Sequence, residues 1–225
     1  MQERKQEGFC RNCGEALGIE DWECDQCPRC KRPLGQTRRR RLTEDDFERM
    51  NLPEEFWRAK VQQVSEKVRP AIIQYLKKIV ENVSRGTGFT LRGATGVGKS
   101  SIASLILKEA RIHGFTGFFV TVWELKEAVR SRLMFDDTRT VLDRCREVHV
   151  LVLDDLGLGD LQGGFGERFV EGLIAYRGSR RRVTVVTTRL EPMKLREELG
   201  QFINTLNGYC PSLLVRGPDL RERSS

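Results

Sequence analysis

The stretch that decides the fold is Gly93-Ala94-Thr95-Gly96-Val97-Gly98-Lys99-Ser100, which fits the phosphate-binding pattern G-x-x-x-x-G-K-[ST] at every fixed position. Its glycines let the backbone turn tightly, so that successive N–H groups face the phosphates of a nucleotide. We expect this stretch and Ser101 to bind ATP, with Lys99 on the β- and γ-phosphates and the Ser100 hydroxyl on Mg²⁺.

The sequence on either side supports this interpretation. Phe89-Thr90-Leu91, just before the loop, is a short run with high strand propensity, and residues 101–110 continue the loop as a helix with one apolar face. A helix that begins under the phosphates adds its dipole to the site. The alternative is a glycine-rich turn that binds nothing, which the strand–loop–helix order disfavours.

Length and composition indicate one sizeable domain with an appendage. The chain has 225 residues, of which 39% are hydrophobic and 32% are charged, enough for a core of about 150–180 residues and a smaller module. No apolar run approaches the ~20 residues that cross a membrane. Residues 1–5 lead into no apolar segment, so we expect no signal peptide and a cytoplasmic location.

The cysteines are concentrated at the front of the chain and predict a zinc ribbon. Paired C-x-x-C units in a cytoplasmic protein indicate metal more often than disulfide. Two segments share the pattern C-x-x-C-x-x-x-L, as two knuckles of a ribbon do, and their cysteines are the expected Zn²⁺ ligands: Cys10, Cys13, Cys27 and Cys30. Cys24 is a spare or alternative ligand. Cys145 and Cys210 are expected to be buried, small apolar side chains.

These patterns divide the chain into three parts. We expect a zinc-ribbon module at residues 1–36, a basic linker and helical lead-in at 37–84, and the ATPase domain at 85–225. Within the lead-in, Thr43 begins a helix, a second segment starts at Pro53, and a long amphipathic helix covers residues 68–83.

Clustered cations predict contact with a polyanion. The net charge is +7, and two stretches, residues 28–43 and 172–190, contain arginines but no acidic residue. Such stretches suit DNA. The equally weighted alternative is that they are a solvated linker and a solvated loop.

Further strands complete the expected nucleotide site. Residues 117–122 and 148–153 are strand candidates, and the second is apolar almost throughout, as expected for a strand buried on both faces of a parallel sheet. It runs into Asp154-Asp155, the Walker B pattern. We assign Asp154 to Mg²⁺ and Asp155 to the attacking water, against the alternative of two solvated turn residues.

Residues 183–187 are a fourth strand candidate, followed by Thr188 and Arg189. In ATPases with an extra strand between the loop strand and the Walker B strand, a polar residue at this point senses the γ-phosphate, a role that we assign to Arg189. Alternating strands and helices predict an α/β fold with a doubly wound parallel sheet and the nucleotide at the carboxyl ends of its strands.

Four stretches resemble the DnaC-type helicase loaders and their IstB-type transposition relatives. They are residues 92–100, 150–157, 173–177 and 216–221, and the Asp-Asp-Leu-Gly and Gly-x-Asp-x-Arg patterns among them are the most specific. The resemblance covers residues 43–221 and implies an AAA+ (ASCE) P-loop ATPase. An N-terminal zinc module before this ATPase is an arrangement known among loaders.

The resemblance also implies partners. It implies a homo-oligomer in the ATP state that grips single-stranded DNA and binds a replicative DNA helicase through its N-terminal region. By the same analogy, residues 123–146 form a helical element turned toward DNA, in which the candidate contacts are Lys126, Arg130 and Arg132. An exposed helix face is the alternative role for these cations.

Two departures from the family bear on hydrolysis. Thr188-Arg189 stands where the family has Ser/Thr-Asn, and residues 203–207 lack the arginine that acts on a neighbour's ATP. Such an arginine finger can contribute about 10³–10⁵ in rate. We therefore expect weak hydrolysis unless Arg177, Arg189 or Arg216 substitutes, and Arg221 fits the family's C-terminal arginine.

The sequence thus leaves three functional hypotheses. The first is an ATP-driven loader of a replicative helicase onto single-stranded DNA. The second is an IstB-like regulator that binds duplex DNA and recruits a transposase. The third is an adaptor that binds ATP without hydrolysing it, with the zinc ribbon as its binding module.

Overall fold

The computed structural model describes residues 8–9, 16–17, 41–132, 139–157, 165–191, 193–194 and 202–220. It divides the chain into two units, Met1–Arg41 and Leu42–Ser225. In the first unit, β1 (Gly8–Phe9) pairs antiparallel with β2 (Ala16–Leu17). All four predicted zinc ligands lie outside the described residues, so zinc binding stays a prediction.

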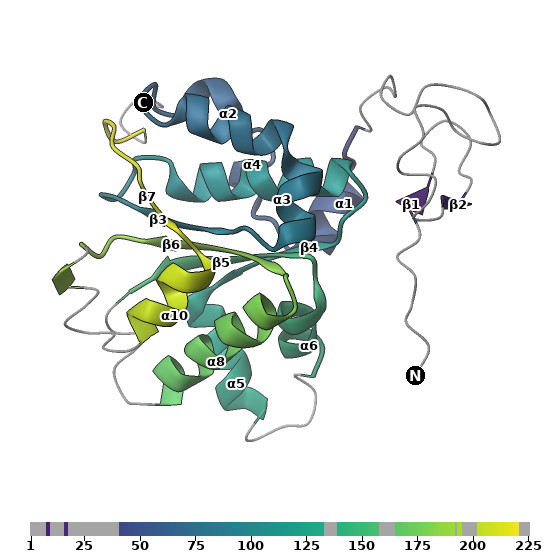
Figure 1. Cartoon of the computed structure of the whole chain (residues 1–225), viewed down its shortest axis with the longest axis vertical. Helices are drawn as coiled ribbons and strands as arrows, with labels where there is room; N and C mark the ends of the chain where they lie inside the picture. The colour runs from purple at the N-terminus through teal and green to yellow at the C-terminus, as the bar shows by residue number, and fades with distance from the viewer. Residues whose placement is uncertain are drawn as a thin grey trace. The chain divides into compact units, whose positions relative to one another are not determined.

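The second unit is built on a five-stranded sheet with the order β4-β5-β6-β3-β7 (Figure 1). All neighbouring strands in it are parallel. The strands are β3 (Phe89–Arg92), β4 (Gly117–Thr121), β5 (Val150–Leu156), β6 (Val183–Thr188) and β7 (Ser212–Leu214). Each of the four predicted strand runs forms a strand, and β6 lies between β3 and β5 as the resemblance implies. No pattern in the sequence predicted β7.

Both faces of the sheet are covered, which confirms the doubly wound fold. In β5, Val150 and Val152 pack into one hydrophobic core, while Leu151 and Leu153 pack into a second core on the opposite face. Helices α1 (Glu44–Arg49), α2 (Arg69–Lys77), α3 (Ile79–Arg85) and α4 (Lys99–Ile112) lie on the first face (Figure 1). Helices α5 (Val122–Arg132), α6 (Arg139–Glu147), α8 (Phe165–Ser179) and α10 (Phe202–Tyr209) lie on the second.

The lead-in is fastened to α4, the helix that follows the phosphate loop. Thr43 caps α1 as predicted, in a capping box with Asp46. The buried Asp46 carboxylate also accepts a hydrogen bond from Arg111 of α4 at 2.9 Å. Two short 3₁₀ helices, Glu54–Phe56 and Val61–Gln63, follow, and Lys108 of α4 donates to the carbonyls of Phe56, Trp57 and Ala59.

The predicted single helix at residues 68–83 is wrong, because the chain leaves helical geometry at Lys78 (φ −103°, ψ 24°). Helix α2 ends at Lys77 and α3 begins at Ile79. The break frees the Tyr75 carbonyl, which accepts a hydrogen bond from the Asn82 side chain at 3.0 Å. Both halves still bury their apolar faces, since Ile72, Tyr75, Ile79 and Val83 all belong to the first core.

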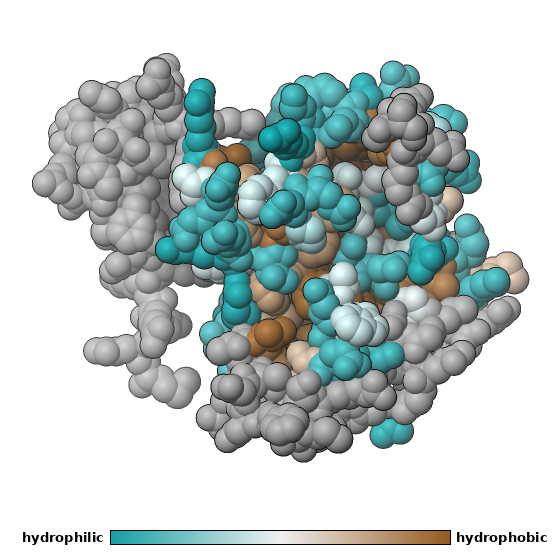
Figure 2. All heavy atoms as spheres, turned by 180° about the vertical axis from the view of Figure 1, so that it is seen from behind, coloured by the Kyte–Doolittle hydropathy of each residue, from teal (hydrophilic) through white to brown (hydrophobic). Residues whose placement is uncertain are grey.

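On the face that Figure 2 shows, hydrophobic side chains are visible between hydrophilic ones. Among the described residues, the exposed large hydrophobic side chains are Trp123, Tyr176, Met193 and Tyr209. Cys145 and Cys210 are buried, as predicted, and burial raises the pKa of each thiol to about 12. Among the described helices, none has the length and apolar character to span a bilayer.

Candidate functional site

The phosphate loop connects the end of β3 at Arg92 to the start of α4 at Lys99, which confirms the expected strand–loop–helix order. Gly98 is the N-cap of α4 and has a left-handed φ of 92°. Gly96 also has a positive φ, 78°. Glycine adopts these conformations without strain, so the loop directs its N–H groups and the N-terminus of α4 toward one point.

The amine of Lys99 lies against the first two residues of the phosphate loop. Nζ donates hydrogen bonds to the carbonyl oxygens of Gly93 at 2.9 Å and Ala94 at 2.6 Å. The side chain is buried, so its position is fixed by packing as well as by these bonds. A phosphate bound in the loop would meet this positive charge directly.

Ser100 and Asp154 lie together, as predicted for a magnesium site. The Ser100 hydroxyl donates to Asp154 Oδ1 at 2.8 Å, although the two residues are 54 positions apart. Burial raises the pKa of Asp154, and hydrogen bonds from Thr187 and Ser100 oppose that shift. A hydroxyl and a carboxylate are the hard oxygen donors that Mg²⁺ takes in phosphate sites, so the residues present fit the ion.

Asp155 lies beside Asp154 but points elsewhere. The pairing of β5 with β6 shifts register between Leu153 and Leu156, and Asp155 has a φ of 56° within this irregularity. Bulges of this kind redirect a side chain, and here Asp155 is exposed while Asp154 is buried. The carboxylate of Asp155 forms an ion pair with Arg189, with Oδ1 3.3 Å from Nε.

Thr187 joins the Asp154 carboxylate to the backbone of Asp155, a role that the sequence did not indicate. Its hydroxyl donates to Asp154 Oδ1 at 2.7 Å and accepts from the Asp155 N–H at 2.9 Å. Hydrogen bonds therefore connect Ser100, Asp154, Thr187 and Asp155, and the ion pair extends the chain to Arg189. The available signal was the polar end of strand β6.

The segment after β7 lies against the phosphate loop. The N–H of Leu220 donates to the Gly96 carbonyl at 2.9 Å. A Cβ added to Gly96 would lie 1.9 Å from Asp219 Oδ1, so a side chain at position 96 would displace this carboxylate. Both residues belong to the stretch 216–221 that carries part of the family resemblance, whereas Arg221 is outside the described residues.

Arg177 cannot replace the missing finger, which corrects that expectation. Its side chain has no exposed area and is surrounded by the carbonyls of Cys145, Arg146, Val148, His149 and Val183. These groups lie near the amino ends of β5 and β6, whereas the phosphate loop lies at the carboxyl ends. Arg189 and Arg216 are both exposed.

The stretch 172–190 does not form the continuous basic patch that its composition indicated. Arg177 is buried and Arg189 pairs with Asp155 of the predicted nucleotide site, while Arg180 and Arg181 are exposed near the amino end of β6. The other basic stretch, residues 28–43, is almost entirely outside the described residues.

The predicted DNA-contacting element contains α5. Lys126 is half-buried on this helix, and the side chains of Arg130 and Arg132 lie outside the described part of the chain. Trp123, at the start of α5, is 64% exposed. The DNA contacts stay predictions.

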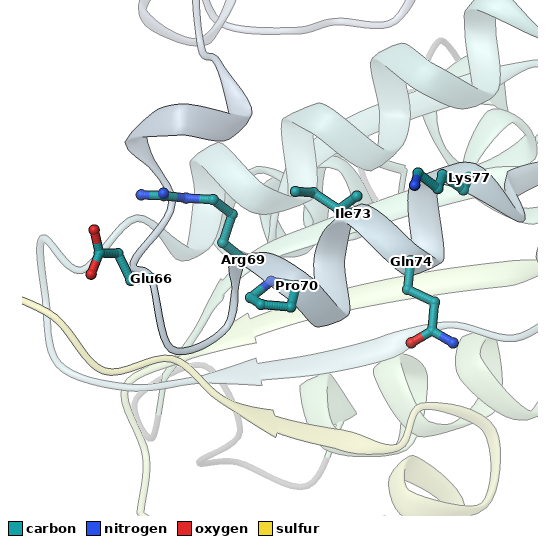
Figure 3. A pocket seen from close by; sticks show the side chains of 6 residues that line it. All are labelled: Glu66, Arg69, Pro70, Ile73, Gln74 and Lys77. Atoms are coloured by element: carbon teal, nitrogen blue, oxygen red, sulfur yellow. The ribbon is translucent and has the colours of Figure 1, made fainter.

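A groove on α2 is separate from the predicted site. Figure 3 shows its lining, which comes from α2 and the turn before it: Glu66, Arg69, Pro70, Ile73, Gln74 and Lys77. Its surface is mainly apolar, although four of the six side chains are polar or charged, and it contains none of the predicted site residues.

Solved structures with the same fold include proteins of DNA replication. The DnaC helicase loader is 23% identical and matches with a TM-score of 0.62 over 73% of this chain and 100% of that one. DnaI is 22% identical, with a TM-score of 0.64 over 75% and 93%. AMPPCP-bound DnaA from Aquifex aeolicus is 16% identical, with a TM-score of 0.61 over 73% and 52%. These likenesses are in fold alone, and they agree with the predicted α/β fold with a doubly wound parallel sheet.

A search of curated proteins found no match. A family model does match, and its description is "IstB-like ATP binding protein". It covers residues 42–201, a range that holds the phosphate loop, both Walker B carboxylates, Thr187 and Arg189. The chain therefore belongs to the IstB-like ATP-binding protein family.

Proposed function

We propose that this protein is an ATP-driven assembly switch that loads a replicative helicase onto single-stranded DNA. The observation that carries the proposal is the connected set Ser100–Asp154–Thr187–Asp155 beside the phosphate loop. A protein that only bound ATP as a structural ligand would have no need of the second carboxylate, Asp155, which we assign to the attacking water. The fold shared with a helicase loader supports the choice of helicase as the partner.

The residues suggest how hydrolysis proceeds. Lys99 and the loop N–H groups would hold the β- and γ-phosphates, and Ser100 and Asp154 would hold Mg²⁺, an ion that neutralises charge on phosphates when bound. Asp155 accepts a proton from the attacking water. The water oxygen forms a bond to the γ-phosphorus as the bond to the ADP oxygen breaks, which gives ADP and phosphate.

The helicase partner can be tested by co-purification. Tagged protein is incubated with the replicative helicase of its host, with ATP, with ADP and without nucleotide. We expect a complex whose amount depends on the nucleotide, because ATP binding controls assembly. Absence of association in all three conditions would exclude helicase loading.

Transposition is the second candidate, favoured by the family to which the chain belongs. A transposition ATPase that recruits a transposase would bind duplex DNA in preference to single strands. Measuring affinity for the two forms of one sequence at equal salt separates the candidates, because salt alone changes DNA affinity strongly. Tighter binding to the duplex would favour transposition over loading.

We predict about one Zn²⁺ per chain, bound by four thiolates at the N-terminus. Metal analysis of the purified protein checks the ratio. Replacing Cys27 by serine is expected to abolish stoichiometric zinc, whereas Cys145→Ser, at a buried cysteine of the other unit, is the matched control and retains it. A folded N-terminal unit without metal would contradict the assignment.

A further inference from the structure

We propose that Arg189 and Asp155 form a latch that the terminal phosphate of ATP opens. Without nucleotide, Arg189 holds the Asp155 carboxylate in an ion pair. When ATP binds, its γ-phosphate attracts the Arg189 guanidinium, and Asp155 is released to take the proton of the attacking water. The inference rests on the proposed ATP hydrolysis, and it explains how Asp155 becomes available as the base.

The geometry of the pair is the first support. Two guanidinium nitrogens approach two carboxylate oxygens, with Nε 3.3 Å from Oδ1 and Nη2 3.4 Å from Oδ2. Asp155 reaches this position through a backbone conformation that is uncommon for a residue other than glycine, φ 56° in the β5 irregularity. Such outliers persist where the surrounding structure holds them, often at functional sites. Here the Thr187 hydroxyl accepts from the Asp155 N–H and holds it.

The exposure of the pair is the second support. The two side chains are 55% and 56% exposed, and solvent-exposed ion pairs contribute little to stability because water screens them. A γ-phosphate carries more negative charge than one carboxylate and binds arginine in the same two-pronged geometry. It can therefore displace Asp155 from the guanidinium.

The position of Arg189 is the third support. The residue before it, Thr188, accepts a hydrogen bond through its carbonyl oxygen from the N–H of Gly93, the first residue of the phosphate loop. Arg189 thus leaves the sheet next to the loop. The neighbouring groups are fixed, since Lys99 and Asp154 are buried and hydrogen-bonded, whereas the Arg189 side chain is exposed. It is the member of the site that can change partner.

The test is a double-mutant cycle on nucleotide affinity, which needs no turnover. Binding of ADP and of a non-hydrolysable ATP analogue, each with Mg²⁺, is measured by displacement of a fluorescent nucleotide. The full chain is used as wild type, Arg189→Ala, Asp155→Asn and the double variant. Arg180→Ala, an exposed arginine outside the site, is the matched control.

We expect Arg189→Ala to weaken the ATP analogue by about tenfold, the effect of one lost charge-assisted contact. ADP has no γ-phosphate, so its affinity should change by less than about twofold, within the effect of a small surface change. Arg189→Lys should restore part of the discrimination because it keeps the charge.

The sign of the coupling separates the latch from simple repulsion. Asp155→Asn removes a negative charge near the γ-phosphate, so it tightens the ATP analogue in either case. If Asp155 competes for Arg189, the gain is larger when Arg189 is present; if it only repels phosphate, the gain is at least as large in the Arg189→Ala background. Equal effects of Arg189→Ala on both nucleotides, or the second sign, would overturn the latch but leave ATP binding intact. A wild type that binds no ATP analogue would overturn the proposed function and the latch with it.

Discussion

Replacing Arg177 by alanine is expected to lower the free energy of unfolding by about 4 kcal/mol, a large part of the 5–15 kcal/mol of a typical domain. The guanidinium donates to five backbone carbonyls and to the Thr184 hydroxyl, at distances from 2.6 to 3.4 Å. Without these donors, buried carbonyl oxygens lose their partners and a cavity opens. Urea unfolding followed by circular dichroism measures the loss.

The expected loss of stability in Arg177→Ala comes from the loss of hydrogen bonds to backbone carbonyls, and not from the loss of an attractive charge interaction. Burial lowers the pKa of Arg177 to about 9, so its positive charge is itself unfavourable in this place, though still present at neutral pH. Arg177→Met separates the effect of the lost hydrogen bonds from that of the cavity, because methionine fills most of the volume but donates no hydrogen bond. We expect it to be nearly as destabilising as alanine.

The control is Arg180→Ala, three residues further along the chain. Arg180 is exposed and stacks on the Tyr176 ring, with Cζ 3.8 Å from the centroid, a contact that contributes about 0.5–1 kcal/mol. Similar losses for Arg177→Ala and Arg180→Ala would show that the buried hydrogen bonds contribute little. A loss confined to Arg177 would identify it as the residue that joins α6, the turn before β5, and β6.

The sequence predicted the parts of the fold whose signals are local. The phosphate loop fixes its own conformation through glycines, and its flanks show strand and helix patterns within a few residues. Residues 150–153 are apolar on both faces, which is why β5 could be placed in the middle of a sheet. Such signals depend on neighbouring residues alone, and the structure confirms them.

Features that depend on distant partners were missed or misread. The break at Lys78 does not alter the spacing of Ile72, Tyr75, Ile79 and Val83, so hydrophobic periodicity could not reveal it. Arg177 looked like one of several surface arginines because its carbonyl partners come from α6, the turn before β5, and β6. Thr187 acts on residues 32 and 33 positions away, and β7 is too short to show a strand pattern.

Lys99→Ala is expected to weaken ATP binding by about 10- to 100-fold and to abolish measurable turnover, because it removes the positively charged amine that contacts the phosphates. Nucleotide affinity comes from fluorescence titration, and turnover from phosphate release with DNA and the partner present. In the structure the amine is held by the Gly93 and Ala94 carbonyls, which water can satisfy once the side chain is gone. The variant should therefore stay folded, as circular dichroism would verify.

This experiment also decides between a switch and a non-hydrolysing adaptor. Lys77→Ala, at an exposed lysine of α2, controls for loss of charge and should bind and turn over ATP like the wild type. Asp155→Asn separates the two steps, because it keeps the loop and Lys99 but removes the base, so binding persists while turnover is lost. The wild type itself is tested first: if it binds ATP without turnover in the presence of DNA and partner, the absence of the finger arginine prevents hydrolysis. The adaptor function then replaces the switch. Turnover that depends on both Lys99 and Asp155 requires a site that uses the second carboxylate, and an adaptor has no use for one.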